Sequence, residues 1–125
     1  GAIAAMKGAG MNPAQVPVTG QDAELAAIQR IIAGEQYMTV YKPIKALAEA
    51  AAELAVAVAN GEEPPEGLVN GEEDNGQEKV PTVFLETIAV TKDNVADTVV
   101  ADGFWTAEDI CTQRYQKACQ DAGIE

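Results

Sequence analysis

The apolar residues of this chain follow two spacings, one typical of helices and one typical of strands. Helical spacing is clearest in residues 44–60, where apolar side chains recur at every third or fourth position before Asn60-Gly61 marks the end. The same spacing in residues 22–33 predicts a second helix, which Gly34 ends. The first residues resemble the last turns of a helix that has no preceding cap, so we expect the chain to be part of a longer one.

Short runs rich in β-branched residues separate these helices. "VPVTG" ends at Gly20, "QYMTVY" ends shortly before Pro43, and "VPTVFLETIAVT" resumes a strand pattern at Val80. Strands that alternate with helices predict an α/β structure with mostly parallel strands. Three strand candidates are too few for a sheet that is covered on both faces, which again favours a missing part.

Residues 61–79, "GEEPPEGLVNGEEDNGQEK", are rich in Gly, Pro, Asn and acidic residues. Such a segment buries little apolar surface, so we expect a long exposed loop. The run from Glu72 to Gly76 has some features of a calcium loop but lacks the alternation of ligands and the distal glutamate. A solvated acidic loop is the better interpretation, and we expect no metal site.

The composition limits the possible functions. With 20 acidic and 8 basic residues, the net charge is −12, which disfavours binding to nucleic acid and to anionic membrane surfaces. The chain contains no histidine, no serine and no glycine-rich phosphate-binding motif. We therefore expect a protein that is not an enzyme and that needs no cofactor.

Asp22 and Lys42 are the candidate binding residues. Asp22 lies between a predicted strand and a predicted helix, where it can cap the helix or bind a ligand. Lys42 ends the next predicted strand, where it can be merely solvated or can bind a ligand. If the two strands are parallel neighbours, both side chains face one crevice. An acceptor and a donor placed in this way suit a neutral polyhydroxy molecule.

Two further pairs of residues lie near the end of the sequence. Cys111 and Cys119 would be about 12 Å apart in a continuous helix, so either they are free or the helix bends back between them. We favour a disulfide in an exported protein over a metal site. Phe104 and Trp105 could form a platform for sugar stacking, although such a pair more often packs a tail onto the body of a protein.

The sequence resembles the C-terminal part of the D-xylose-binding proteins, which are periplasmic or lipid-anchored receptors of ABC sugar importers. The resemblance lies in "GAIAAMK", "VPVTGQDAELAAIQRIIAGEQYMTVYKPI", "LAEAAAELAVAVANGE", "VPTVFLETIAVTKDNVADTVVADGF" and "ICTQRYQKACQDAGI". It covers nearly the whole chain. It implies the type I periplasmic-binding fold, a Rossmann-like α/β fold with parallel sheets, in which two lobes joined by three chain crossings close on a sugar.

In this family, the residues that match Asp22 and Lys42 bind the sugar from the C-terminal lobe. The resemblance implies that residues 1–42 belong to that lobe and end at the hinge, that residues 43–79 belong to the N-terminal lobe, and that residues 80–125 form the return strand, hinge and tail. The expected partners are a monosaccharide such as D-xylose, the N-terminal part of the receptor and an ABC permease.

A periplasmic or extracellular location, with a possible lipid anchor before the first residue, is implied in the same way. An effector domain of a sugar-responsive transcription regulator and an interaction module with a degenerate site remain as alternatives.

Overall fold

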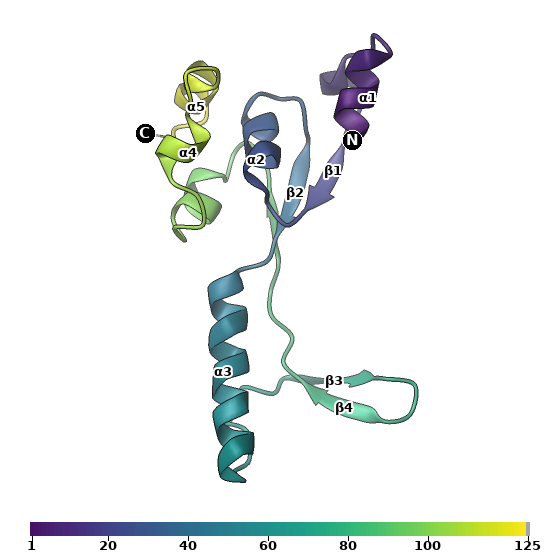
Figure 1. Cartoon of the computed structure of the whole chain (residues 1–125), viewed down its shortest axis with the longest axis vertical. Coiled ribbons are helices and arrows are strands. Elements are labelled where there is room, and N and C mark those ends of the chain that lie inside the picture. Colours follow the sequence, from purple (N-terminus) through teal and green to yellow (C-terminus); the bar gives the residue numbers. More distant parts are fainter. Residues whose placement is uncertain (125) are drawn as a thin grey trace. The chain divides into compact units, whose positions relative to one another are not determined.

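The computed structural model describes residues 1–124 and contains two compact units (Figure 1). Unit 1 consists of Gly1–Lys42 together with the chain from Thr87 onward, and unit 2 is Pro43–Glu86. The chain therefore leaves unit 1 after Lys42 and returns to it at Thr87.

Unit 1 contains a three-stranded sheet in the order β1 (Thr19–Gln21), β2 (Met38–Tyr41), β5 (Ile88–Val90). β1 and β2 are parallel, as the sequence predicts, and the family's α/β class is confirmed. β5, however, is antiparallel to β2, so the expectation of mostly parallel strands is wrong for this strand. Because the chain leaves unit 1 at the end of β2 and returns at the start of β5, the two strands run in opposite directions.

Helices of unit 1 pack beside this sheet around a core of aliphatic residues. α2 (Leu25–Ile32) supplies Ile28, Ile31 and Ile32, which are almost fully buried, and Gly34 follows with a φ of 75°. The predicted helix face and its stop are thus confirmed. The other helical segments are α1 (Ala2–Gly8), η1 (Pro13–Gln15), the π-helical η2 (Ala96–Val100), α4 (Ala107–Ile110) and α5 (Gln116–Asp121).

A capping box starts α4. The Thr106 hydroxyl accepts a hydrogen bond from the Asp109 backbone N–H, and the Asp109 carboxylate accepts one from the Thr106 N–H. Asp109, at the third position of the helix, and not the neighbouring Glu108, is the acidic residue of this box. Hydrogen bonds from the Thr106 side chain and backbone lower the pKa of the Asp109 carboxyl.

The predicted disulfide between Cys111 and Cys119 is present. The helical path is interrupted after Ile110, and α5 begins only at Gln116, so the chain bends back between the two cysteines. Their Cα atoms lie 5.8 Å apart instead of the about 12 Å of a straight helix. Cys119 belongs to the buried core, so the disulfide ties the tail of the chain to the body of unit 1.

Unit 2 contains α3 (Ile44–Asn60) and a hairpin formed by β3 (Gly71–Asp74) and β4 (Lys79–Thr82). The end of α3 is as predicted, because Gly61 adopts a left-handed φ of 71° and its N–H bonds to the last turn. The expectation of one long loop over residues 61–79 is wrong for the part that forms the hairpin.

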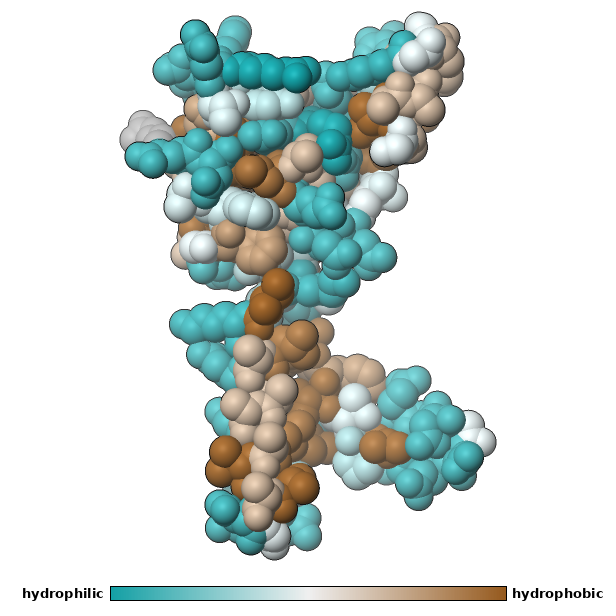
Figure 2. Space-filling view, viewed as in Figure 1, coloured by the Kyte–Doolittle hydropathy of each residue, from teal (hydrophilic) through white to brown (hydrophobic). Residues whose placement is uncertain are grey.

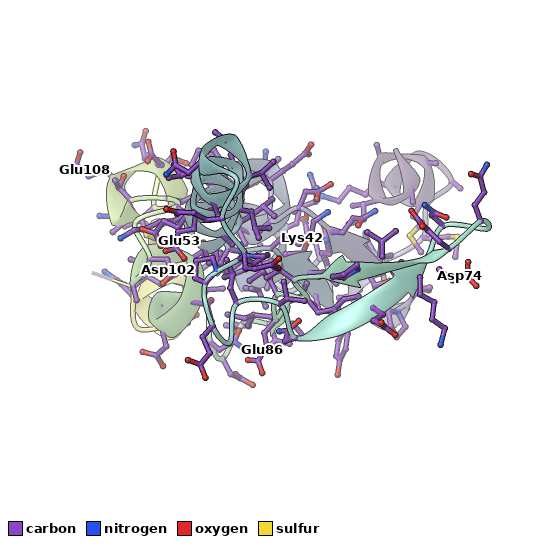
Figure 3. All side chains as sticks on the ribbon, turned by 90° about the horizontal axis from the view of Figure 1, so that it is seen from below. Lys42, Glu53, Asp74, Glu86, Asp102 and Glu108 are labelled. Atoms are coloured by element: carbon purple, nitrogen blue, oxygen red, sulfur yellow. A yellow bond between two sulfur atoms is a disulfide. The ribbon has the colours of Figure 1, made fainter. Side chains whose placement is uncertain are left out.

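Side chains in the turn explain this hairpin. Asn75 Oδ1 accepts hydrogen bonds from the N–H groups of Gln77 and Glu78, and Asp74 Oδ1 accepts one from Gly76. Asn-Gly is a strong hairpin signal, and Gly76 has a φ of 88°. Asp74, at the end of β3, is labelled in Figure 3. Local turn chemistry thus orders a segment that has no apolar core.

The predicted strand near residues 80–91 is two separate strands. β4 ends at Thr82 in unit 2, and β5 begins at Ile88 in unit 1. The boundary between the units falls between Glu86 and Thr87, inside the predicted run. β-propensity alone does not reveal that two different sheets share this run.

Apolar side chains of α3 are exposed along much of its length (Figure 2). Ile44 is 56% exposed, Leu47 57% and Val58 72%. The repeat that predicts this helix is therefore real, but its apolar face is not covered within unit 2. Among the described residues, no helix is both long and apolar enough to cross a membrane.

Candidate functional site

The ends of β1 and β2 bring the two predicted binding residues together. The parallel register aligns Thr19 with Met38 and Gln21 with Val40. Asp22 continues this ladder by one bond, since its N–H donates to the Val40 carbonyl at 2.8 Å. Lys42 follows directly after β2 and is labelled in Figure 3. Because β1 and β2 are parallel, Asp22 and Lys42 both lie at the edge of the sheet where the carboxyl ends of these strands meet.

Asp22 does not cap the following helix. The cap position of α2 is Glu24, whose side chain makes no capping hydrogen bond, and Asp22 instead has a left-handed φ of 74°. Ala23, which follows, also has a positive φ of 48°. The capping interpretation of Asp22 is therefore wrong, because Asp22 and Ala23 form a tight turn that precedes the cap position at Glu24. The turn leaves the Asp22 carboxylate free of any role in the helix.

Lys42 forms a salt bridge with the Asp22 carboxylate. Its Nζ also donates a hydrogen bond to Gln21 Oε1, at 3.4 Å. The side chains of Lys42 and Asp22 are 49% and 57% exposed, so water screens their attraction. Gln21 was not singled out in the sequence, although its place as the last residue of β1, next to Asp22, could have marked it.

Asp22, Lys42 and Gln21 form a trio of polar side chains. The carboxylate accepts hydrogen bonds, the ammonium donates them, and the amide can donate and accept. Hydroxyl groups of a polyol can bond to all three. No nucleophile with an adjacent base lies here, and no group of three or more His, Cys, Asp or Glu residues in residues 1–124 could hold a metal ion. The acceptor and donor groups of the trio are suited to hydrogen-bond recognition.

The trio is an open surface site. A cavity of about 420 Å³ borders α1 and β1 and includes Gln21, but neither Asp22 nor Lys42 lines it. It also contains Lys7 and Glu35, which form a salt bridge of 2.6 Å with each other. Asp22 and Lys42 therefore lie outside this cavity, exposed at the ends of their strands.

An aromatic cluster contacts the residues at the ends of β1 and β2. The rings of Tyr41 and Phe104 have centroids 5.1 Å apart, and those of Phe104 and Trp105 are 5.4 Å apart. Trp105 Nε1–H donates to the Ala23 carbonyl at 2.8 Å. Of the two interpretations of Phe104 and Trp105, the packing of a tail onto the body is confirmed. Burial, together with the nearby Asp102 carboxylate, raises the pKa of Tyr41.

Two curated relatives are similar to most of the chain. It is 48% identical over 110 residues to a D-xylose-binding periplasmic protein of Haemophilus influenzae. The matched region covers 88% of this chain and 32% of that protein. It is 49% identical over 104 residues to the D-xylose-binding periplasmic protein of Escherichia coli. The matched region covers 83% of this chain and 30% of that protein. The chain thus spans about a third of the length of these relatives.

A solved structure and a family model agree with these relatives. A carbohydrate transporter solute binding protein from Chloroflexus aurantiacus, in complex with D-glucose, matches with a TM-score of 0.69 and 39% identity over 74% of this chain and 26% of that one. The family model described as "Periplasmic binding protein domain" matches residues 1–63. None of these proteins is described as a transcription regulator, so that alternative has no support from them.

Proposed function

The chain belongs to the family of periplasmic binding protein domains, and on that premise we propose that it is part of a receptor that captures a monosaccharide for an ABC importer. D-xylose is the proposed sugar, because two relatives at 48% and 49% identity are described as D-xylose-binding. The observation that carries the proposal is the meeting of Asp22 and Lys42 at neighbouring strand ends in a chain this similar to sugar-binding proteins.

In the proposed complex, Asp22 accepts hydrogen bonds from sugar hydroxyls and Lys42 donates one to a hydroxyl or to the ring oxygen. The two groups form a solvent-exposed salt bridge with each other, which a sugar bound to both would replace. Such a pair contributes about 0–1 kcal/mol, so the exchange costs little. Gln21 lies within reach of the Lys42 ammonium and keeps it oriented while the salt bridge opens.

We propose that the two units belong to different lobes of the receptor. Unit 1 then contributes the half-site, and the chain crosses the hinge near Lys42–Pro43 and again near Glu86–Thr87. The exposed apolar residues of α3, Ile44 and Leu47 among them, are then covered by the remaining two thirds of the receptor. Burial of such apolar surface contributes about 25 cal/mol per Å² and so favours association of the two parts.

Binding by two lobes gives the receptor its signal. A sugar that touches Asp22 and Lys42 from one side and groups of the N-terminal lobe from the other stabilises only the closed state, so it shifts the receptor towards closure. The closed form is presented to the permease without any change to the sugar. The proposed location is the periplasm or the outer face of the cell, with an anchor, where there is one, in a segment before residue 1.

Calorimetric titration of the receptor that contains this chain tests the function. We expect D-xylose to bind with higher affinity than D-glucose, and Asp22→Ala to weaken D-xylose binding by at least tenfold. A receptor that binds neither sugar contradicts the proposed function. Equal affinities contradict only the choice of D-xylose.

The chain without its N-terminal partner offers a second test. We expect it to show no measurable D-xylose binding, because only one side of the site is present. Binding by the isolated chain at the affinity of the receptor contradicts the division of the site between two lobes.

A further inference from the structure

Asp22 and Ala23 adopt a left-handed backbone conformation, which residues other than glycine seldom adopt. Both Asp22 and Ala23 have positive φ values, 74° and 48°, although neither is glycine. Two successive side-chain-bearing residues in the left-handed region are uncommon, and such turns persist only where the surrounding structure fixes them. Something outside the turn must therefore hold it.

Three hydrogen bonds fix the turn. Asp22 N–H donates to the Val40 carbonyl at 2.8 Å, and Ala23 N–H donates to the buried Thr39 Oγ1 at 3.3 Å. The third bond comes from a distant part of the chain: Trp105 Nε1–H donates to the Ala23 carbonyl at 2.8 Å. The two bonds from β2 hold the N–H side of the turn, and Trp105 alone holds the carbonyl that follows it.

Trp105 is itself well anchored. Its backbone N–H donates to the Val99 carbonyl at 3.1 Å, at the end of η2, and the next residue begins the capping box of α4. Its ring packs edge-on against Phe104, which in turn packs against Tyr41, the neighbour of Lys42. The Phe104–Trp105 pair therefore contacts the turn that follows β1, at Ala23, and the end of β2, at Tyr41.

We propose that Trp105 is a positioning residue for sugar binding: its indole N–H holds the Ala23 carbonyl and thereby fixes the left-handed turn that presents the Asp22 carboxylate. The proposal rests on the sugar-binding function proposed above. Trp105 does not touch the sugar in this arrangement. It acts through Asp22, so its effect on affinity depends on the presence of that carboxylate.

Trp105→Phe in the receptor that contains this chain removes the N–H and keeps an aromatic ring. We expect D-xylose affinity to fall by about fivefold, the effect of one ordinary hydrogen bond. In an Asp22→Ala background, the same substitution should leave the remaining affinity unchanged. Gln29→Met is the matched control, since Gln29 Nε2 also donates to backbone carbonyls, at Asp109 and Ile110, but not to this turn. It should leave affinity at the wild-type value.

Two results would overturn the proposal while leaving the sugar-binding function intact. One is wild-type affinity in Trp105→Phe while Asp22→Ala binds weakly. The other is an equal loss from Trp105→Phe with and without the Asp22 carboxylate, which would mean that Trp105 acts on the sugar directly. Where Trp105→Phe does not fold, 3-benzothienylalanine at position 105 keeps the shape of the indole and lacks only the N–H.

Amide hydrogen exchange provides a readout that needs no sugar. We expect the Asp22 and Ala23 amides to exchange faster in Trp105→Phe than in the wild type and in Gln29→Met. Unchanged exchange at both amides overturns the proposal even if the receptor binds no sugar. Faster exchange in a receptor that binds no sugar supports the role of Trp105 in fixing the turn and counts against the proposed function alone.

Discussion

Lys42 forms a salt bridge with Asp22 across two neighbouring parallel strands, and both residues immediately follow the strands that carry them. The pair is exposed on the surface of unit 1, so it contributes little to the stability of the fold. Its importance lies in geometry, because it shows that one carboxylate and one ammonium reach the same point from two strands.

Replacement of Lys42 tests this geometry most directly. Lys42→Met keeps the length of the side chain and removes the charge, and with it the charged hydrogen bond that we propose for the sugar. We expect D-xylose affinity in the receptor to fall by at least about tenfold, or roughly 1.4 kcal/mol, measured by calorimetry. Lys117→Met is a matched control, because Lys117 is also exposed and pairs with a carboxylate, Asp121, at 3.0 Å. Equal affinities for the wild type and Lys42→Met would show that Lys42 is only a solvated strand end.

Asp22→Gly separates the binding role of Asp22 from its backbone. Glycine adopts a φ of 74° without steric cost, so we expect the free energy of unfolding to rise by about 0.5 kcal/mol. Affinity for D-xylose should fall at least tenfold, because the carboxylate is lost. Chemical denaturation and calorimetry on the same variant measure the two effects.

Gln21→Gly is the control for Asp22→Gly, since Gln21 lies in β1, where glycine weakens the strand by about 0.5–1 kcal/mol. If Asp22→Gly destabilises the protein as much as Gln21→Gly does, the left-handed turn is not strained. If Asp22→Gly binds D-xylose as well as the wild type, the carboxylate has no role in binding.

The disulfide should contribute measurably to stability. Replacing both Cys111 and Cys119 by Ala opens a short loop, and the entropy of closing such a loop corresponds to about 2.5 kcal/mol. Cys119 is buried, so loss of packing adds to this effect. Urea denaturation of the oxidised wild type and the double variant measures the difference. A reductant should destabilise the wild type and leave the double variant unchanged, and equal stabilities would contradict the prediction.

The sequence predicted those elements whose signals are local. α3 and α2 follow from the spacing of their apolar residues, and their ends follow from Gly61 and Gly34, which adopt the left-handed conformation that the predictions require. The spacing of Cys111 and Cys119 allows either free cysteines or a bend between them, and the break between α4 and α5 permits the disulfide that we favoured. In each case, neighbouring residues decide the structure.

Elements that depend on distant parts of the chain were missed. The antiparallel direction of β5 depends on where the chain returns to unit 1, at Thr87, which no periodicity reveals. For Asp22 the sequence leaves both a helix cap and ligand binding open, because an aspartate before a helix is a common capping signal. The structure instead shows a left-handed turn whose Ala23 is hydrogen-bonded to Thr39 and to Trp105, and the latter lies more than 80 residues away.

The capping box of α4 provides a test of how Thr106 and Asp109 contribute to stability. Thr106→Ala removes the hydroxyl that accepts from the Asp109 N–H and donates to its carboxylate at 2.6 Å. We expect the free energy of unfolding at neutral pH to fall by about 1 kcal/mol, as for other threonine caps. Thr112→Ala, an exposed threonine that follows α4, serves as the control and should have little effect.

The difference between the wild type and Thr106→Ala should depend on pH. Hydrogen bonds from Thr106 lower the pKa of Asp109 below its model-compound value of 3.8, so the folded state favours the ionised carboxylate. This contribution to stability is present above about pH 3.8 and is lost as the pH falls through the lowered pKa of the folded state. Urea denaturation of both proteins between pH 7 and about pH 2 should show their free energies of unfolding converging at the acidic end. A difference that stays constant over the whole range would show that the Asp109 carboxylate takes no part in the cap.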